Sequence, residues 1–178
     1  MTLPTRSIAV DGLVVSIRPQ RPEDATFLYA LFRANALRDL ERAGLPQALL
    51  DNLIDLQHRS RGDTYRGLYP QAEWSILDVS DEPIGELVEN DEGRCVYVVD
   101  LTLLPAWQAR GVGPAVMRAI MADSAALGKD VRANVLFTNE PCLKMCARLG
   151  FVASPPDESA HMALRWTAES TAESQAPG

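Results

Sequence analysis

The segment WQARGVGPAVM, residues 107–117, contains two closely spaced glycines and an arginine that together suggest an anion-binding site. Gly111 and Gly113 stand one residue apart, behind Arg110 and at the start of an apolar run. Glycine lets the backbone approach a ligand closely, and a helix N-terminus offers unpaired N–H groups and the positive end of the helix dipole. With the arginine, this arrangement is typical of a phosphate or pyrophosphate site. The alternative is a glycine turn that only starts a helix.

Other chemical motifs do not fit the sequence. A dinucleotide fingerprint requires a third glycine where Val116 stands, and no G-x-x-x-x-G-K-[ST] string occurs. His58 and His161 lie far apart, and no group of histidines, cysteines and acids has metal-ligand spacing. The sequence therefore predicts neither a P-loop nor a metal site.

Composition and charge narrow the class of protein. The chain has 178 residues, enough for one domain, and carries 24 acids against 17 bases for a net charge of −7. This balance disfavours a nucleic-acid binder, which needs a basic face. No apolar run approaches the roughly 20 residues of a membrane span, and residues 1–12 show no secretion signal. Three cysteines, Cys95, Cys142 and Cys146, indicate no disulfide framework and fit the cytoplasm.

The elements around these residues predict an α/β chain. Strands are expected over residues 13–19, 73–79, 84–90, 95–104, 131–137 and 161–166, the second and third forming a hairpin. Helices are expected over residues 22–44, 46–62, 113–127 and 139–150, and residues 61–71 are expected to form a loop. Residues 1–166 thus form one domain, and the TAES-repeating tail 167–178 is expected to be disordered.

Two segments of the chain resemble the GNAT family of acyltransferases, the N-acetyltransferases. LTLLPAWQARGVGPAVM, residues 101–117, is similar to the acyl-CoA-binding segment, whose signature Q/R-x-x-G-x-G/A matches Gln108, Gly111 and Gly113. NEPCLKMCARLGF, residues 139–151, resembles the second segment, N-x-x-A-x-x-x-Y-x-x-x-G-F, at the expected distance. The resemblance spans roughly residues 13–166 and is strongest over residues 100–151.

The resemblance implies a central mixed, mostly antiparallel sheet of six to seven strands flanked by about four helices, with acetyl-CoA as cosubstrate. The pantetheine arm would lie between the strands at 100–104 and 131–137, splayed apart, and Asn139 would hydrogen-bond it. The N–H of Leu103 or its neighbour would polarise the thioester carbonyl. The pyrophosphate cradle would consist of backbone N–H groups from Gln108, Ala109, Arg110, Gly111, Val112 and Gly113.

The chain departs from the family pattern at two positions. Pro114 removes one N–H donor after the second glycine, which a first helical turn tolerates. Cys146 stands where the family has a tyrosine that is often called the general acid. Cys146 is therefore a candidate acid, and the alternative is a small buried residue that only packs, as is expected of Cys142 one turn earlier.

Family chemistry, direct attack of an amine on the thioester, needs a base because the amine must be neutral. Asp100 interrupts the most apolar strand and, by period two, is expected to share a face with Val98 and Thr102. Partial desolvation would raise its pKa into a useful range. The alternative is a structural acid paired with an arginine. Glu86 and Glu73 are rival bases, and the alternative for Glu86 is an exposed hairpin residue.

The resemblance implies an acceptor pocket built from the first two helices, the loop after them and the final strands. Tyr65 and Tyr69 of the expected loop are candidates to bind the acceptor, or they cover a core edge. His58 is expected to compensate a helix dipole and Trp107 to pack beside the glycine loop.

These observations favour a cytoplasmic N-acetyltransferase that moves an acetyl group from acetyl-CoA to a small-molecule or peptide amine. The alternative, favoured by Cys146, is a non-catalytic acyl-CoA-binding or regulatory module on the same fold. No nucleic-acid or membrane partner is expected, and a homodimer stays open.

Overall fold

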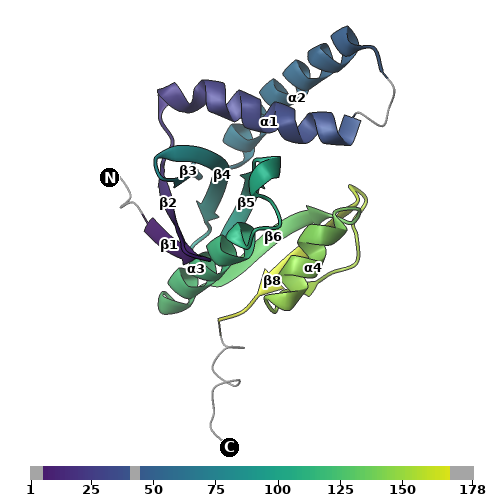
Figure 1. Ribbon diagram of the computed structural model, residues 1–178. Helices are drawn as coiled ribbons and strands as arrows, with labels where there is room; N and C mark the ends of the chain where they lie inside the picture. The colour runs from purple at the N-terminus through teal and green to yellow at the C-terminus, as the bar shows by residue number, and fades with distance from the viewer. Residues whose placement is uncertain (1–5, 41–44, 169–178) are drawn as a thin grey trace, which may run out of the picture.

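The chain folds into one sheet with helices on both faces, as the computed structural model shows for residues 6–40 and 45–168 (Figure 1). Its elements in chain order are β1 (Arg6–Val10), β2 (Leu13–Pro19), η1 (Pro22–Asp24), α1 (Ala25–Leu40), α2 (Gln47–Leu68), β3 (Glu73–Val79), β4 (Glu82–Asp91), β5 (Cys95–Leu103), η3 (Pro105–Trp107), α3 (Val112–Ala126), β6 (Asp130–Leu136), α4 (Glu140–Arg148), β7 (Val152–Ala153) and β8 (His161–Trp166).

The sheet is mixed and mostly antiparallel, which confirms the predicted fold class. Its strand order is β1-β2-β3-β4-β5-β6-β8-β7, and every neighbouring pair is antiparallel except β5 with β6. The described residues form eight strands rather than six or seven, together with the four expected α-helices. The long apolar strand β5 has neighbours on both sides, as its nearly continuous hydrophobic run predicts.

The two strands at the edges of the sheet, β1 and β7, were not predicted from the sequence. β1 pairs with β2 through a tight turn in which Asp11 and Gly12 have φ of +46° and +82°. An Asp-Gly pair between apolar segments is a strong hairpin signal, so this strand could have been predicted. β7 has only two residues, too few for any periodic signal.

The predicted loop at residues 61–71 is wrong, because α2 continues to Leu68. Glycines at 62 and 67 each weaken a helix by roughly 1 kcal/mol, which made a stop there reasonable. Contacts with the sheet outweigh this cost. The Arg66 guanidinium lies 4.9 Å from the Trp74 ring centroid, and the ring centroids of Tyr69 and Tyr97 are 5.2 Å apart. The predicted stop of the first helix at Gly44 lies outside the described residues.

The two faces of the sheet support cores of different size. α3 and α4 share the larger apolar core, to which Val98, Val116 and Leu164 contribute. α1 and α2 cover the other face, where Leu31, Ile54, Ile76 and Val88 are buried; α1 contacts β4 there. Figure 1 shows α1 and α2 together on one side and α3 and α4 on the other. The end of β5 connects the two layers, because it leads into α3 on one face and adjoins α1 on the other.

The start of the predicted tail is attached to the domain. The backbone N–H of Ala168 donates to Oδ1 of Asp130 at 3.4 Å, and Ala168 packs against the larger core. Residues 169–178, which make up the rest of the tail predicted to be disordered, lie outside the described residues.

Candidate active site

The glycine loop between β5 and α3 has the backbone geometry of an anion cradle. Ala109 and Gly111 adopt positive φ of +56° and +80°, and Gly111 is the N-cap of α3. Backbone that alternates into the left-handed region turns successive N–H groups toward a common point. A Cβ on Gly111 would meet Oδ2 of Asp11 at 3.3 Å. Position 111 therefore favours glycine chiefly for its φ, because the Asp11 side chain is exposed and can shift.

The first turn of α3 adds donors to this loop. The N–H of Ala115 bonds to the carbonyl of Gly111 at 3.1 Å, so the helix ladder begins there and the N–H groups of Val112 and Gly113 lie before it. The Arg110 guanidinium stacks over the Trp107 ring at 4.4 Å from its centroid, which keeps the cation beside the loop. These residues fit a pyrophosphate by backbone donors and one nearby charge.

β5 and β6 separate immediately after they pair. Their ladder runs from Cys95↔Asp130 to Val98↔Ala133 and stops, whereas β5 stays paired with β4 as far as Leu103. The N–H of Leu104 donates to the carbonyl of Ile84 in β4 at 2.8 Å. Because successive peptide groups of a strand point in opposite directions, the N–H of Leu103 points away from β4, toward the side where the ladder with β6 has ended.

Two amide side chains hold the end of β5 where β6 no longer does. Asn35 of α1 donates to the Leu103 carbonyl at 3.1 Å, and Gln108 donates to the same oxygen at 2.9 Å. Gln108 also donates to Oδ1 of Asn35 at 2.8 Å. The network joins the first helix, the end of β5 and the glycine loop. The sequence pattern predicted that Gln108 lies near the cofactor but gave no hint of Asn35. A lone asparagine within a helix belongs to no recognisable motif.

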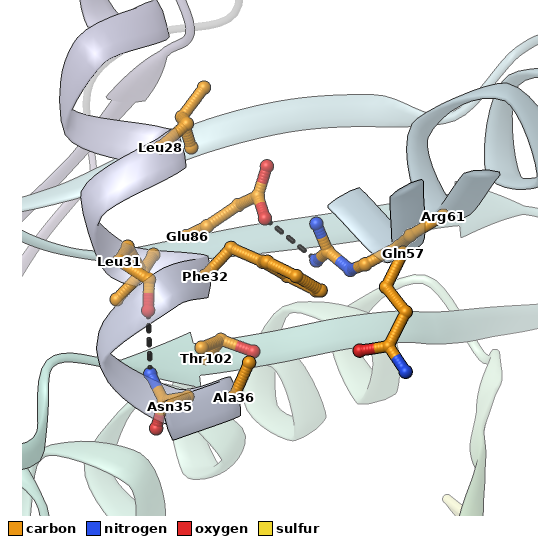
Figure 2. Close-up of a pocket in the computed structure, with 9 residues that line it drawn as sticks. All are labelled: Leu28, Leu31, Phe32, Asn35, Ala36, Gln57, Arg61, Glu86 and Thr102. Atoms are coloured by element: carbon orange, nitrogen blue, oxygen red, sulfur yellow. Dashed lines mark hydrogen bonds and ion pairs between the residues drawn. The ribbon is translucent and has the colours of Figure 1, made fainter. Parts of the chain in front are cut away.

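A cavity of about 340 Å³ lies between α1, α2 and the β4–β5 pair. Figure 2 shows its lining, with apolar side chains on α1 and charged side chains on the sheet and α2. The lining residues are Leu28, Leu31, Phe32, Asn35, Ala36, Gln57, Arg61, Glu86 and Thr102. Since Asn35 touches both this cavity and the Leu103 carbonyl, the cavity adjoins the end of β5.

One arginine joins two carboxylates at this cavity, a group that we call the Arg61 cluster: Arg61, Glu86 and Asp100. Nη2 of Arg61 lies 2.8 Å from Oε2 of Glu86, and its Nε donates to Oδ2 of Asp100 at 3.0 Å. Thr102 donates to Oδ1 of Asp100 at 2.8 Å. Both oxygens of Asp100 are thus engaged, whereas the second oxygen of Glu86 points away from Arg61 (Figure 2).

Glu86 is buried, which corrects the expectation that it could be an exposed hairpin residue: it is 3% exposed. Burial raises the pKa of Glu86, and the Arg61 guanidinium opposes that rise without cancelling it. A carboxylate with a raised pKa at the wall of a cavity is a better proton acceptor than an ordinary exposed carboxylate. Glu73, the other rival base, is exposed at the start of β3, away from this cavity.

The predicted face of Asp100 is partly wrong. Val88 and Glu89 of β4 pair with Asp100 and Val98, so Val99 is an extra residue that forms a β-bulge in β5. The bulge shifts the alternation of side chains by one residue. Val98 consequently packs in the larger core, while Asp100 faces α2 together with Thr102.

The residues of the second segment lie on α4 as predicted for a helix with Asn139 at its N-cap. Oδ1 of Asn139 accepts from the N–H of Cys142 at 3.3 Å. Cys146 lies in the larger core at 2% exposure, and the hydrogen bond with Cys142 together with burial raises its pKa above the ordinary range of a thiol. Cys142 is half-buried at the edge of that core.

The tyrosines predicted to bind the acceptor stand beside the cavity rather than in its lining. Arg61 lies 5.0 Å from the Tyr65 ring centroid, and Tyr69 packs on Tyr97. His58 sits inside α2 between the rings of Tyr29 and Phe32, not at a helix end, because α2 continues beyond it. Burial and Arg61 lower the pKa of His58. Arg61 was not predicted as a site residue. It was expected at the start of a loop, and nothing nearby in the sequence indicated that it would bind Glu86 and Asp100.

Two features are absent from residues 6–40 and 45–168. No three histidine, cysteine or acidic side chains gather there as a metal site would require. No helix in this part of the chain is both long and apolar enough to cross a membrane.

Comparison with known proteins identifies relatives of this architecture. The family model described as "Acetyltransferase (GNAT) family" matches residues 34–151. The fold is similar to PaiA N-acetyltransferase from Thermoplasma acidophilum in complex with coenzyme A, at 13% identity, a TM-score of 0.64, and coverage of 86% of this chain and 98% of that one. An acetyltransferase from Thermus thermophilus has 17% identity, a TM-score of 0.64 and coverage of 91% and 99%. Mycobacterium smegmatis RimJ in complex with CoA-disulfide has 16% identity, a TM-score of 0.62 and coverage of 93% and 88%. No curated protein matches the chain by sequence.

Proposed function

The chain belongs to the GNAT acetyltransferase family, and from this premise we propose that it transfers the acetyl group of acetyl-CoA to a primary amine by direct attack. One observation carries the proposal: a positive-φ glycine loop at a helix start, the open end of β5 and a cavity with a buried carboxylate adjoin one another. These three features supply a cofactor cradle, a backbone donor and a base.

The glycine loop would hold the cosubstrate. Backbone N–H groups from Ala109 to Gly113 would bind the pyrophosphate, because the N–H of Gln108 donates to the Pro105 carbonyl at 3.3 Å. The pantetheine arm would pass between the separated ends of β5 and β6 near Asn139. Acetyl-CoA supplies an activated thioester. The N–H of Leu103 would stabilise negative charge that develops on the carbonyl oxygen, and Asn35 and Gln108 hold the peptide that follows it.

The Arg61 cluster would provide the base. Glu86 lines the cavity and has a raised pKa, so we propose that it takes the proton of the attacking amine. Asp100, the base favoured by the sequence, would then act mainly by fixing Arg61, because Arg61 and Thr102 occupy its two oxygens. The leaving thiolate would take its proton from solvent, since Cys146 lies in the core.

The test measures release of free thiol when the protein is incubated with acetyl-CoA and a panel of primary amines. Thiol release that depends on the amine supports the enzyme. Glu86→Gln should lower kcat by about 100-fold or more, the lower range of general base catalysis. Glu82→Gln, an exposed carboxylate on the same strand, is the matched control and should leave kcat unchanged.

The cradle is tested separately by calorimetry with CoA. Gly111→Ala should weaken CoA binding by about tenfold or more, since a side chain there obstructs the approach to the backbone donors. Gly93→Ala is the control, because Gly93 has nearly the same φ of +81° and open space around it, far along the chain from the loop. A folded Gly111→Ala variant that binds CoA as tightly as wild type and Gly93→Ala would refute the cradle. CoA binding without thiol release for any amine would favour the non-catalytic acyl-CoA-binding module.

A further inference from the structure

The cavity beside the Arg61 cluster has two chemically different walls. Side chains from α1, namely Leu28, Leu31, Phe32 and Ala36, form an apolar wall. Glu86 and Arg61 oppose it from the sheet and α2 (Figure 2). At about 340 Å³ the cavity is at the small end of the range for ligand sites. The part of a ligand that enters it is therefore small, with an apolar body and one polar end.

The charges decide which polar end fits. Among the described residues that line the cavity, Arg61 is the only cation, and it is shared between two carboxylates. The other two arginines of α2, Arg59 and Arg66, are both exposed, and Arg66 stacks on Trp74. With Glu86 and Asp100 ionised, the cluster carries a net charge of −1. An anionic group in the cavity would face Glu86 without an uncommitted cation, which is costly in a buried site.

We propose that the acceptor is a small monocationic amine on an apolar alkyl or aryl body, without a carboxylate on the amine-bearing carbon. This rests on the proposed acetyl transfer and specifies the substrate class of that site. The ammonium group is attracted to the net negative Arg61 cluster, Glu86 takes its proton, and the apolar body packs on the α1 wall. A free amino acid is disfavoured because its carboxylate would need Arg61, which is already bound twice.

Three ligands that differ in one group test the charge argument. Isopentylamine, leucine amide and leucine share an amine and a branched alkyl body, and only leucine has a carboxylate. Titrated by calorimetry into CoA-saturated protein at pH 7, leucine should bind about tenfold or more weakly than either of the others. Leucine amide controls for size. Equal or tighter binding of leucine, or no binding of any of the three, overturns the proposal.

A charge variant sharpens the test. Glu86→Gln removes one negative charge at nearly constant shape, so isopentylamine should bind more weakly. The ratio of the affinities of leucine amide and leucine, which we call the affinity gap, should narrow several-fold, as the loss of one nearby unit charge predicts. Glu82→Gln should retain the wild-type gap. An unchanged gap in Glu86→Gln would overturn the assignment of selectivity to the Arg61 cluster.

Thiol release with the same three amines separates this proposal from the proposed function. Release with leucine preferred would uphold acetyl transfer and overturn the acceptor class. Selective binding of isopentylamine and leucine amide without release would uphold the acceptor class and refute the transfer.

Discussion

The two faces of the β4–β5 pair differ in chemistry although they share a backbone. Leu87 and Val98 face α3 in the larger core, whereas Glu86 and Asp100 face α2 and bind Arg61. Leu87 and Glu86 are adjacent and both buried, at 0% and 3% exposure. Alternation separates Leu87 from Glu86 in β4, and the bulge at Val99 separates Val98 from Asp100 in β5. Burial by itself therefore does not distinguish a core residue from a residue suited to chemistry.

Arg61→Ala should break the charged face most severely. It leaves the buried Glu86 and the half-buried Asp100 without their cation, and breaking a buried ion pair typically costs about 3–5 kcal/mol of unfolding free energy. The pKa of Glu86 is already raised above its ordinary 4.5, and losing Arg61 raises it further. The folded variant then binds more protons than the unfolded chain, so its stability rises as pH falls from the raised pKa toward 4.5.

Chemical denaturation at pH 7 and pH 5 measures this effect. Arg59→Ala, an exposed arginine on the same helix, is the control and should remain near wild type at both pH values. The loss of unfolding free energy in Arg61→Ala should be smaller at pH 5 than at pH 7. A loss that is the same at both pH values would contradict the charge argument.

Ile120→Ala tests the apolar face in contrast. Ile120 of α3 is 1% exposed in the larger core, and its truncation should cost about 2–5 kcal/mol through lost burial and a cavity. This loss should not vary between pH 7 and pH 5, because no titratable group is involved. Denaturation curves that show a strong pH dependence of the loss would indicate that the two faces are coupled.

Asn35→Ala tests the junction between the two faces. The Leu103 carbonyl would lose one of two amide donors and Gln108 would lose its acceptor on Asn35, so stability should fall by about 1–3 kcal/mol. If Asn35 positions the end of β5 for transfer, kcat should fall while the KM for acetyl-CoA changes little. Asn52→Ala on the exposed surface of α2 is the control. An unchanged kcat in a folded Asn35→Ala variant would show that Asn35 stabilises the fold and does not position the end of β5 for transfer.

Cys146→Ala should have the smallest effect. Cys146 belongs to the apolar core, so alanine should cost about 1 kcal/mol, a common value for a modest core substitution. Turnover measured by thiol release should stay within a few-fold of wild type. A loss of about 100-fold or more, as expected for a missing general acid, would instead place this thiol in the chemistry.

Local signals in the sequence were enough to predict much of the fold. Apolar alternation predicted a strand over residues 131–137, where β6 runs from Asp130 to Leu136, and Asn139 with Gly150 marked the ends of the last helix. These signals act within a few residues, where backbone preference and capping decide the structure. The end of α2 failed because contacts with the sheet overrode two glycines, and local rules do not include such contacts.

The candidate site divides in the same way. The sequence by itself determined the glycine loop at 111 and 113, its place before a helix and the apolar run of β5, since each depends on neighbouring residues. Tertiary structure alone decided that a bulge at Val99 turns Asp100 toward α2, that Arg61 joins Asp100 to Glu86, and that Asn35 reaches Leu103. Arg61 and Asp100 are 39 positions apart and Asn35 and Leu103 are 68 apart. Such pairs form only when packing of the helices on the sheet brings the segments together. The spacing of residues within a short stretch of the chain does not predict these contacts.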